Sequence, residues 1–207
     1  MNERPFLPNL TIAFFAYFAI ALIGLHFLRP DYTPVDHMIS DYAVGRFGWI
    51  MTTAFISVSL GCLCLAIGLG RDGPKTVLVA IARVLMGIAS LGLLVTAAFQ
   101  TDLETVMVNT THGNIHTLSF LVNIVSLFLA ALGLSVSLGA DARWKSLRTP
   151  ALILVAALAI AFVAQAMTLH RGAPYGITNR IFVVVLISWL MLIAVRLRTV
   201  SSLPRTA

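Results

Sequence analysis

The sequence predicts an all-α polytopic membrane protein with six transmembrane helices in one domain over residues 1–207. Only 11% of the residues are charged and 59% are hydrophobic, whereas a soluble domain carries about 25% charged residues. Six apolar stretches approach the roughly 20 residues that a helix needs to cross a bilayer. The links between them are short, so we expect consecutive helices to be antiparallel neighbours in one bundle.

The first three predicted spans cover residues 10–28, 49–69 and 77–99. The first ends at Arg29-Pro30 and is too long for the apolar core of a signal peptide, so we predict a retained span. The second ends at a stretch with two glycines and a proline, residues 70–74. The third contains Arg83 about one turn inside its start, and we expect this side chain to snorkel back to the membrane surface.

The last three predicted spans cover residues 115–138, 151–169 and 181–195. The fourth is opened by His112 and His116. Pro150 directly precedes the fifth and marks its start, since proline is favoured in the first turn of a helix. The sixth is followed by Arg196 and Arg198, as expected where a span leaves the membrane.

The Lys and Arg residues are unequally divided between the two ends of these spans. Four lie at one end: Arg29, Arg46, Arg171 and Arg180. The other ten lie at the opposite end: Arg4, Arg71, Lys75, Arg83, Arg143, Lys145, Arg148, Arg196, Arg198 and Arg205. Basic residues are retained on the cytoplasmic side, so both termini are predicted to be cytoplasmic. Because the basic residues flank apolar runs and form no single patch, a nucleic-acid partner is excluded.

The predicted outer side carries most of the groups that can do chemistry. All five histidines fall there: His26, His37, His112, His116 and His170. Five of the eight acidic residues fall there as well: Asp31, Asp36, Asp41, Asp102 and Glu104. We therefore expect a functional site that faces the outside or the periplasm.

The stretch His112-Gly113-Asn114-Ile115-His116 opens the fourth span. Histidines four residues apart lie on one face of a helix, where they can bind one metal ion or share a proton. His116 is followed by an apolar run. Burying an ionisable group at that depth costs free energy, so we treat His116 as a candidate functional residue. The structural alternative is a pair of histidines hydrogen-bonded to neighbouring helices.

Three more positions complete the candidate site. If residues 36–42 are helical, His37, Ser40 and Asp41 share a face and can act as a ligand or acid–base set; the alternative is a helix cap. Asp102 directly follows the third span. Arg180 begins the sixth span on the side where basic residues are disfavoured, so it either pairs with Asp41, Asp102 or a bound anion, or snorkels.

These motifs resemble those of domain-of-unknown-function family 998, a group of six-pass prokaryotic membrane proteins. The resemblance rests on Ser40-Asp41-Tyr42, Thr101-Asp102, the His112–His116 stretch and Asn179-Arg180, and it implies the inner membrane of a bacterial or archaeal cell. A more distant likeness is to ceramidases and progestin/adiponectin-receptor-like membrane hydrolases, which hold zinc with three histidines beside a serine and an aspartate. In that analogy His112 and His116 match the HxxxH motif, and Ser40 and Asp41 match the serine and aspartate.

The main functional hypothesis is a metal-dependent hydrolase that acts on a lipid or small amphiphile. His37, His112 and His116 would hold Zn²⁺, Asp41 or Asp102 would orient a histidine or act as general base, and Arg180 would bind an anionic head group. Haem, held by His37 or His26 together with His116, is the alternative cofactor. The sequence is also compatible with a small-molecule transporter or binding protein, and with a purely structural bundle without catalysis.

Overall fold

The computed structural model describes residues 5–103, 108–170 and 173–204, and this part of the chain contains helices and no strand. Its long helices are α1 (Phe6–Leu28), α2 (Gly48–Asp72), α3 (Val77–Ala98), α4 (Thr111–Ser137), α5 (Arg148–Met167) and α6 (Tyr175–Ser201). Three short 3-10 helices are η1 (Ile39–Ala43), η2 (Leu138–Ala140) and η3 (Lys145–Leu147). All six long helices are apolar and long enough to cross a membrane, so the predicted fold class is confirmed. Glu104 and Arg171 lie outside the described residues.

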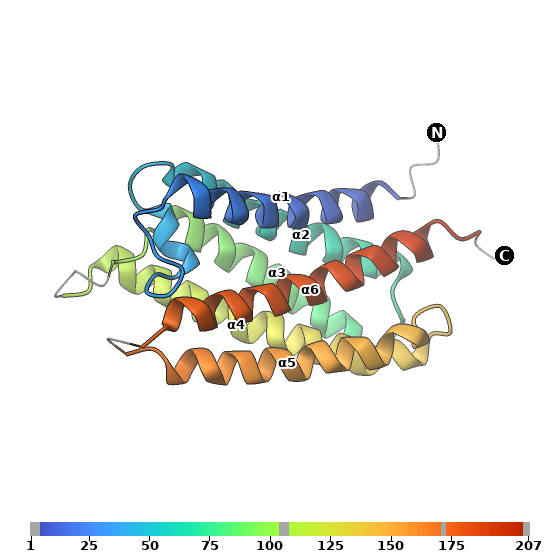
Figure 1. Ribbon diagram of the computed structural model, residues 1–207. Coiled ribbons are helices and arrows are strands. Elements are labelled where there is room, and N and C mark those ends of the chain that lie inside the picture. The colour runs from blue at the N-terminus through green and yellow to red at the C-terminus, as the bar shows by residue number, and fades with distance from the viewer. Residues whose placement is uncertain (1–4, 104–107, 171–172, 205–207) are drawn as a thin grey trace.

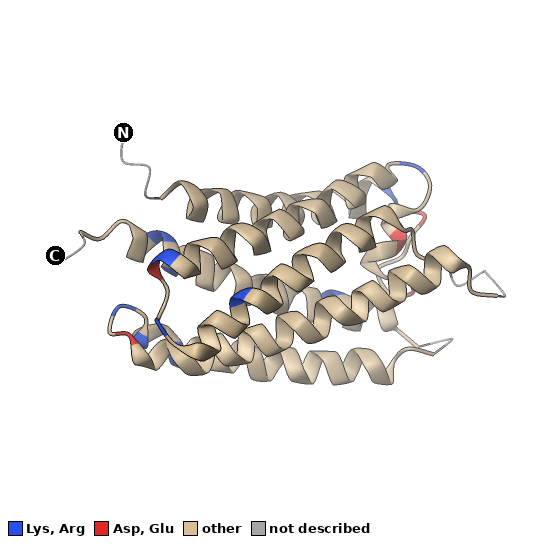
Figure 2. Cartoon of the chain, turned by 180° about the vertical axis from the view of Figure 1, so that it is seen from behind, with Lys and Arg blue, Asp and Glu red and all other residues tan. Residues whose placement is uncertain are grey.

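The six helices form an up-and-down bundle (Figure 1). Each of the first four packs against its neighbour in the sequence, α5 packs against α4 and α6, and α6 returns to contact α1 and α2. The start of α1 and the end of α6 lie at one end of the bundle, which we call the terminal end (Figure 1). The opposite end carries η1 and all five histidines, and we call it the histidine end. The charged positions gather towards these two ends (Figure 2).

Five helices begin earlier than hydropathy predicts, and the starts of α4, α5 and α6 have local explanations. α4 begins at Thr111 because the side chain of Thr110 accepts a hydrogen bond from the backbone N–H of Gly113 and caps the helix. α5 begins at Arg148, so Pro150 lies in its first turn. α6 begins at Tyr175, directly after Pro174. The polar residues that open α4 and α6 therefore lie on helices and have fixed directions.

Small polar side chains bridge the helices inside the apolar bundle. Ser59 of α2 donates to the backbone carbonyl of Ser90 in α3 over 2.7 Å. The indole N–H of Trp189 in α6, which is fully buried, donates to the hydroxyl of Ser135 in α4 over 3.0 Å. Such bonds satisfy polar groups that water cannot reach in the membrane.

Candidate functional site

A cavity of about 360 Å³ opens at the histidine end of the bundle. On α4 its wall runs from His116 to Leu127, and on α6 it runs from Tyr175 to Ile187. These stretches span roughly 17 Å at about 1.5 Å per residue. The cavity is therefore long enough for a hydrocarbon chain and lies parallel to the helices.

The wall of the cavity is more polar near the histidine end than in its deeper part, where Asn123 lies among apolar side chains. Its deeper part is formed by aliphatic and aromatic side chains such as Leu127, Phe182 and Ile187. Four of the predicted site residues line it near the histidine end: Ser40, Asp41, Asp102 and His116. The other three, His37, His112 and Arg180, are not among the residues that line this cavity. The structure thus brings together part of the predicted site.

His116 is buried, with 5% of its surface exposed, and its ring is held in one orientation. Its Nδ1 lies 2.8 Å from the backbone carbonyl oxygen of Phe99, just past the end of α3. A carbonyl oxygen only accepts hydrogen bonds, so Nδ1 carries the proton and Nε2 of the neutral ring keeps a lone pair. His116 therefore offers an acceptor.

A chain of hydrogen bonds continues from His116 into the wall. The hydroxyl of Ser119 lies 2.8 Å from both the backbone carbonyl of His116 and the hydroxyl of Thr96. The amide N–H of Asn123 donates to Thr96 over 3.0 Å. These bonds join α3 to α4 and explain why polar residues occur at this depth of both helices.

Asp102 caps the start of α4. One carboxylate oxygen accepts from the backbone N–H of Thr110 and the other from its hydroxyl, each over 2.7 Å. A side chain at Gly113 would collide with the carboxylate, so glycine is needed at the second position of the His112–His116 stretch. The negative charge also interacts favourably with the N-terminus of a helix.

Ser40 and Asp41 lie on η1, whereas His37 lies outside it. The short helix begins only at Ile39, and a carboxylate oxygen of Asp41 accepts from the backbone N–H of Met38 over 2.8 Å. The His37 ring instead stacks on Tyr32, with ring centroids 4.6 Å apart. The helix starts after His37, so the condition under which His37, Ser40 and Asp41 would share one helical face is not met.

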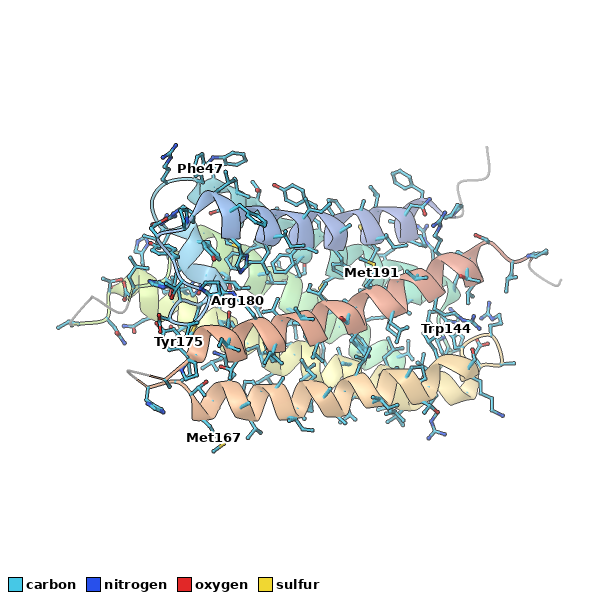
Figure 3. All side chains as sticks on the ribbon, viewed as in Figure 1. Phe47, Trp144, Met167, Tyr175, Arg180 and Met191 are labelled. Carbon is cyan, nitrogen blue, oxygen red and sulfur yellow. The ribbon has the colours of Figure 1, made fainter. Side chains whose placement is uncertain are left out.

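Arg180 is held by neutral groups. Its hydrogen-bond acceptors are Nε2 of His26 (2.9 Å), the backbone carbonyls of Pro34 (3.0 Å), His37 (2.6 Å) and Gly176 (2.9 Å), and the hydroxyl of Tyr42 (3.2 Å). The guanidinium thus ties α6 to the segment between α1 and η1 (Figure 3). Binding of an anionic head group by Arg180 stays a prediction.

Two further residues of α6 belong to this end of the bundle: Gly176, which no motif contained, and Asn179, which the sequence analysis named only as part of the Asn179-Arg180 motif. Gly176 donates its backbone N–H to the carbonyl of Val35 over 2.9 Å. A side chain there would lie 2.5 Å from the carbonyl oxygens of both Pro34 and His37. Asn179 accepts from the backbone N–H of Ile39 over 3.0 Å. The available signal was the spacing, since Gly176 and Arg180 lie one turn apart on a helix.

The comparison with protein families gives one match. The family model described as "Protein of unknown function (DUF998)" matches residues 11–196. The chain belongs to the DUF998 family. No curated protein and no solved structure matches it. The match covers the whole cavity and every residue that contacts Arg180, which confirms the family resemblance drawn from the motifs.

A zinc centre has no support in the described part of this DUF998 protein. Those residues contain no group of three or more His, Cys, Asp or Glu side chains placed to hold a metal ion. His112 is exposed and packs on the ring of Phe99, 5.2 Å between centroids. His116 is turned to the carbonyl of the same residue, and His37 lies against Tyr32. Haem ligation stays a prediction.

Proposed function

We propose that this membrane protein binds an amphiphile in the cavity at the histidine end. The ligand has one apolar chain and a small head group with hydrogen-bond donors. The observation that carries the proposal is a cavity, inside a bundle of apolar helices, whose wall is more polar near the histidine end than in its deeper part. Ligand sites are commonly apolar clefts with a few convergent polar groups.

The exposed residues of the wall indicate where the ligand enters. Thr117 and Leu121 of α4 and Leu169 beyond α5 line the cavity and are also exposed. They mark an opening on the lipid-facing side of the bundle, near its histidine end. A molecule dissolved in the bilayer can reach the cavity from there without crossing water. Membrane lipids therefore surround the protein and also supply the ligand.

The polar groups of the wall favour a head group that donates. Among the described residues, those that line the cavity include two carboxylates, Asp41 and Asp102, and no Lys or Arg. His116 presents the lone pair of Nε2 because Phe99 holds the proton on Nδ1. An amine or hydroxyl head group can donate to these acceptors, whereas a phosphate or carboxylate head group would meet like charge. Metal-dependent hydrolysis is not part of this proposal.

The test is equilibrium binding of dodecylamine to the protein in lipid nanodiscs. Ile187→Trp, on the cavity wall, should fill the deep part and weaken binding about tenfold or more. Val184→Trp is the matched control, because Val184 is 61% exposed and does not line the cavity. Dodecyl sulfate should bind more weakly than dodecylamine to the wild type. Equal affinity of the two tryptophan variants for dodecylamine would overturn the proposal.

A further inference from the structure

Two cationic side chains meet at Gly70, near the terminal end of α2. Lys75, in the link between α2 and α3, donates from Nζ to the backbone carbonyls of Gly70 (2.7 Å) and Arg71 (3.1 Å). Arg83, on α3, donates from Nε to the backbone carbonyl of Ala66 over 2.8 Å. Both positive charges therefore lie against the same turn of α2.

Glycine at position 70 allows the guanidinium to lie flat on α2. A side chain there would collide with Nη2 and Cζ of Arg83. Arg83 is therefore held against the neighbouring helix, two residues before its end at Asp72, and the expected snorkelling stays a prediction. Its position is six residues inside α3, which is roughly 9 Å along the helix axis.

Most of the donors of these two side chains are left for another partner. A guanidinium has five N–H groups and an ammonium three. In the described part of the chain, their hydrogen bonds go to the carbonyls of Ala66, Gly70 and Arg71, which carry no charge. Asp72, the acidic residue closest in sequence, accepts from Ser201 on α6. A positive charge at this depth of a membrane is costly without an anion.

We propose that Lys75 and Arg83 bind the phosphate group of an anionic phospholipid at this point. A guanidinium and an ammonium on one turn match the oxygens of a phosphate. Lys75 is exposed and Arg83 is half-buried, so the head group can reach both from the surrounding bilayer. The predicted orientation places the site in the cytoplasmic leaflet, where anionic lipids attract basic residues.

The test counts phosphatidylglycerol molecules that stay bound to the detergent-solubilised full chain in native mass spectrometry. Lys75→Gln and Arg83→Lys should each lower the affinity for phosphatidylglycerol about tenfold. Lys75→Gln alters an exposed link and keeps the Ala66 contact, so it should fold even if Arg83→Lys does not. Arg198→Gln is the control, because it removes one exposed charge at the same end.

Three outcomes would overturn the proposal. An equal loss of affinity for phosphatidylglycerol in Lys75→Gln and Arg198→Gln would show that only the summed charge of this end attracts the lipid. Equal retention of phosphatidylcholine and phosphatidylglycerol by the wild type would remove the phosphate-specific site. Inorganic phosphate that stabilises the wild type as well as the lipid does, with the effect lost in Lys75→Gln, would make free phosphate the ligand.

Discussion

Arg180 fixes the position of a whole segment with one side chain. Its partners come from α1, from the segment that precedes η1, from η1 and from its own helix. His26 can accept from the guanidinium because its other ring nitrogen, Nδ1, donates to the carbonyl of Leu22 over 2.7 Å. The arrangement needs a planar group with several fixed donor directions, which lysine lacks.

Arg180→Lys should therefore destabilise the protein although it keeps the charge. Hydrogen bonds to charged groups contribute about 1.5–3 kcal/mol each, so we expect the free energy of unfolding to fall by at least about 2 kcal/mol. Thermal unfolding in detergent measures the change. Arg46→Lys is the control, because Arg46 is exposed and its guanidinium rests on the ring of Phe47. Equal melting temperatures for the two variants would contradict the assignment.

The ion pair between Arg29 and Asp31 should give a pH-dependent stability. The guanidinium donates to the carboxylate over 2.7 Å and lowers the pKa of Asp31 from its ordinary value of 3.8. A lowered pKa in the folded state means that the pair stabilises the protein above pH 3.8 and loses this effect as the pH falls through the folded value. Asp31 is exposed at the surface, so the effect is small.

Asp31→Asn should therefore melt slightly below the wild type at neutral pH. The difference should vanish only as the pH falls from 3.8 through the lowered pKa of Asp31 in the folded protein, because the wild-type carboxylate becomes protonated there. The measurement is the melting temperature of both proteins across an acid titration. A difference that stays constant over the whole titration would show that the charge of Asp31 is not responsible.

At the scale of the elements, the start of α6 and the segment before η1 form one unit. Gly176 lets three backbone carbonyls approach the first turn of α6 so closely that a methyl group at this position would collide with them. Gly176→Ala should destabilise the protein by about 1–3 kcal/mol, as overpacking does. Gly87→Ala in α3 is the control, because a side chain there would meet nothing within 4 Å. The control should be neutral or up to about 1 kcal/mol more stable.

These variants are compared by thermal unfolding and by proteolysis at the histidine end. Gly176→Ala should expose the segment before η1 to protease, whereas Gly87→Ala should not. Unchanged protection in Gly176→Ala would show that the segment does not depend on close approach to α6.

The element scale also shows what hydropathy can and cannot predict. The six spans are confirmed because apolar length alone decides them. The starts of α4 and α6 were predicted too late, because polar residues such as His112 and Arg180 lower the hydropathy of turns that are nonetheless helical. Capping by Thr110 and contacts between distant segments decide those turns, and a hydropathy pattern does not contain them.

At the scale of the whole molecule, both termini are expected on the cytoplasmic side. A green fluorescent protein fused after the last residue should fluoresce, because it matures in the cytoplasm. An alkaline phosphatase fused there should be inactive, because that enzyme matures only outside the cytoplasm. Fusions within the link between α3 and α4 should behave in the opposite way. The reversed pattern would place the histidine end in the cytoplasm and contradict the charge rule.

The candidate site was predictable only in part. An even alternation of spans brings Ser40, Asp41, Asp102 and His116 to one end, so the sequence could place them together. It could not separate His37 from Asp41, because that depends on where a short 3-10 helix begins. It also could not show the cavity, because a cavity depends on the spacing of helices that are not neighbours in the sequence.

The contacts of Arg180 also set an order for biosynthesis. Its partners His26 and Tyr42 lie 154 and 138 residues earlier in the chain. A nascent chain can therefore insert the first five helices while the segment between α1 and η1 still lacks its anchor. The histidine end closes only when the last helix leaves the translocon, so a chain that stops before α6 should carry an open segment that quality-control proteases can cut.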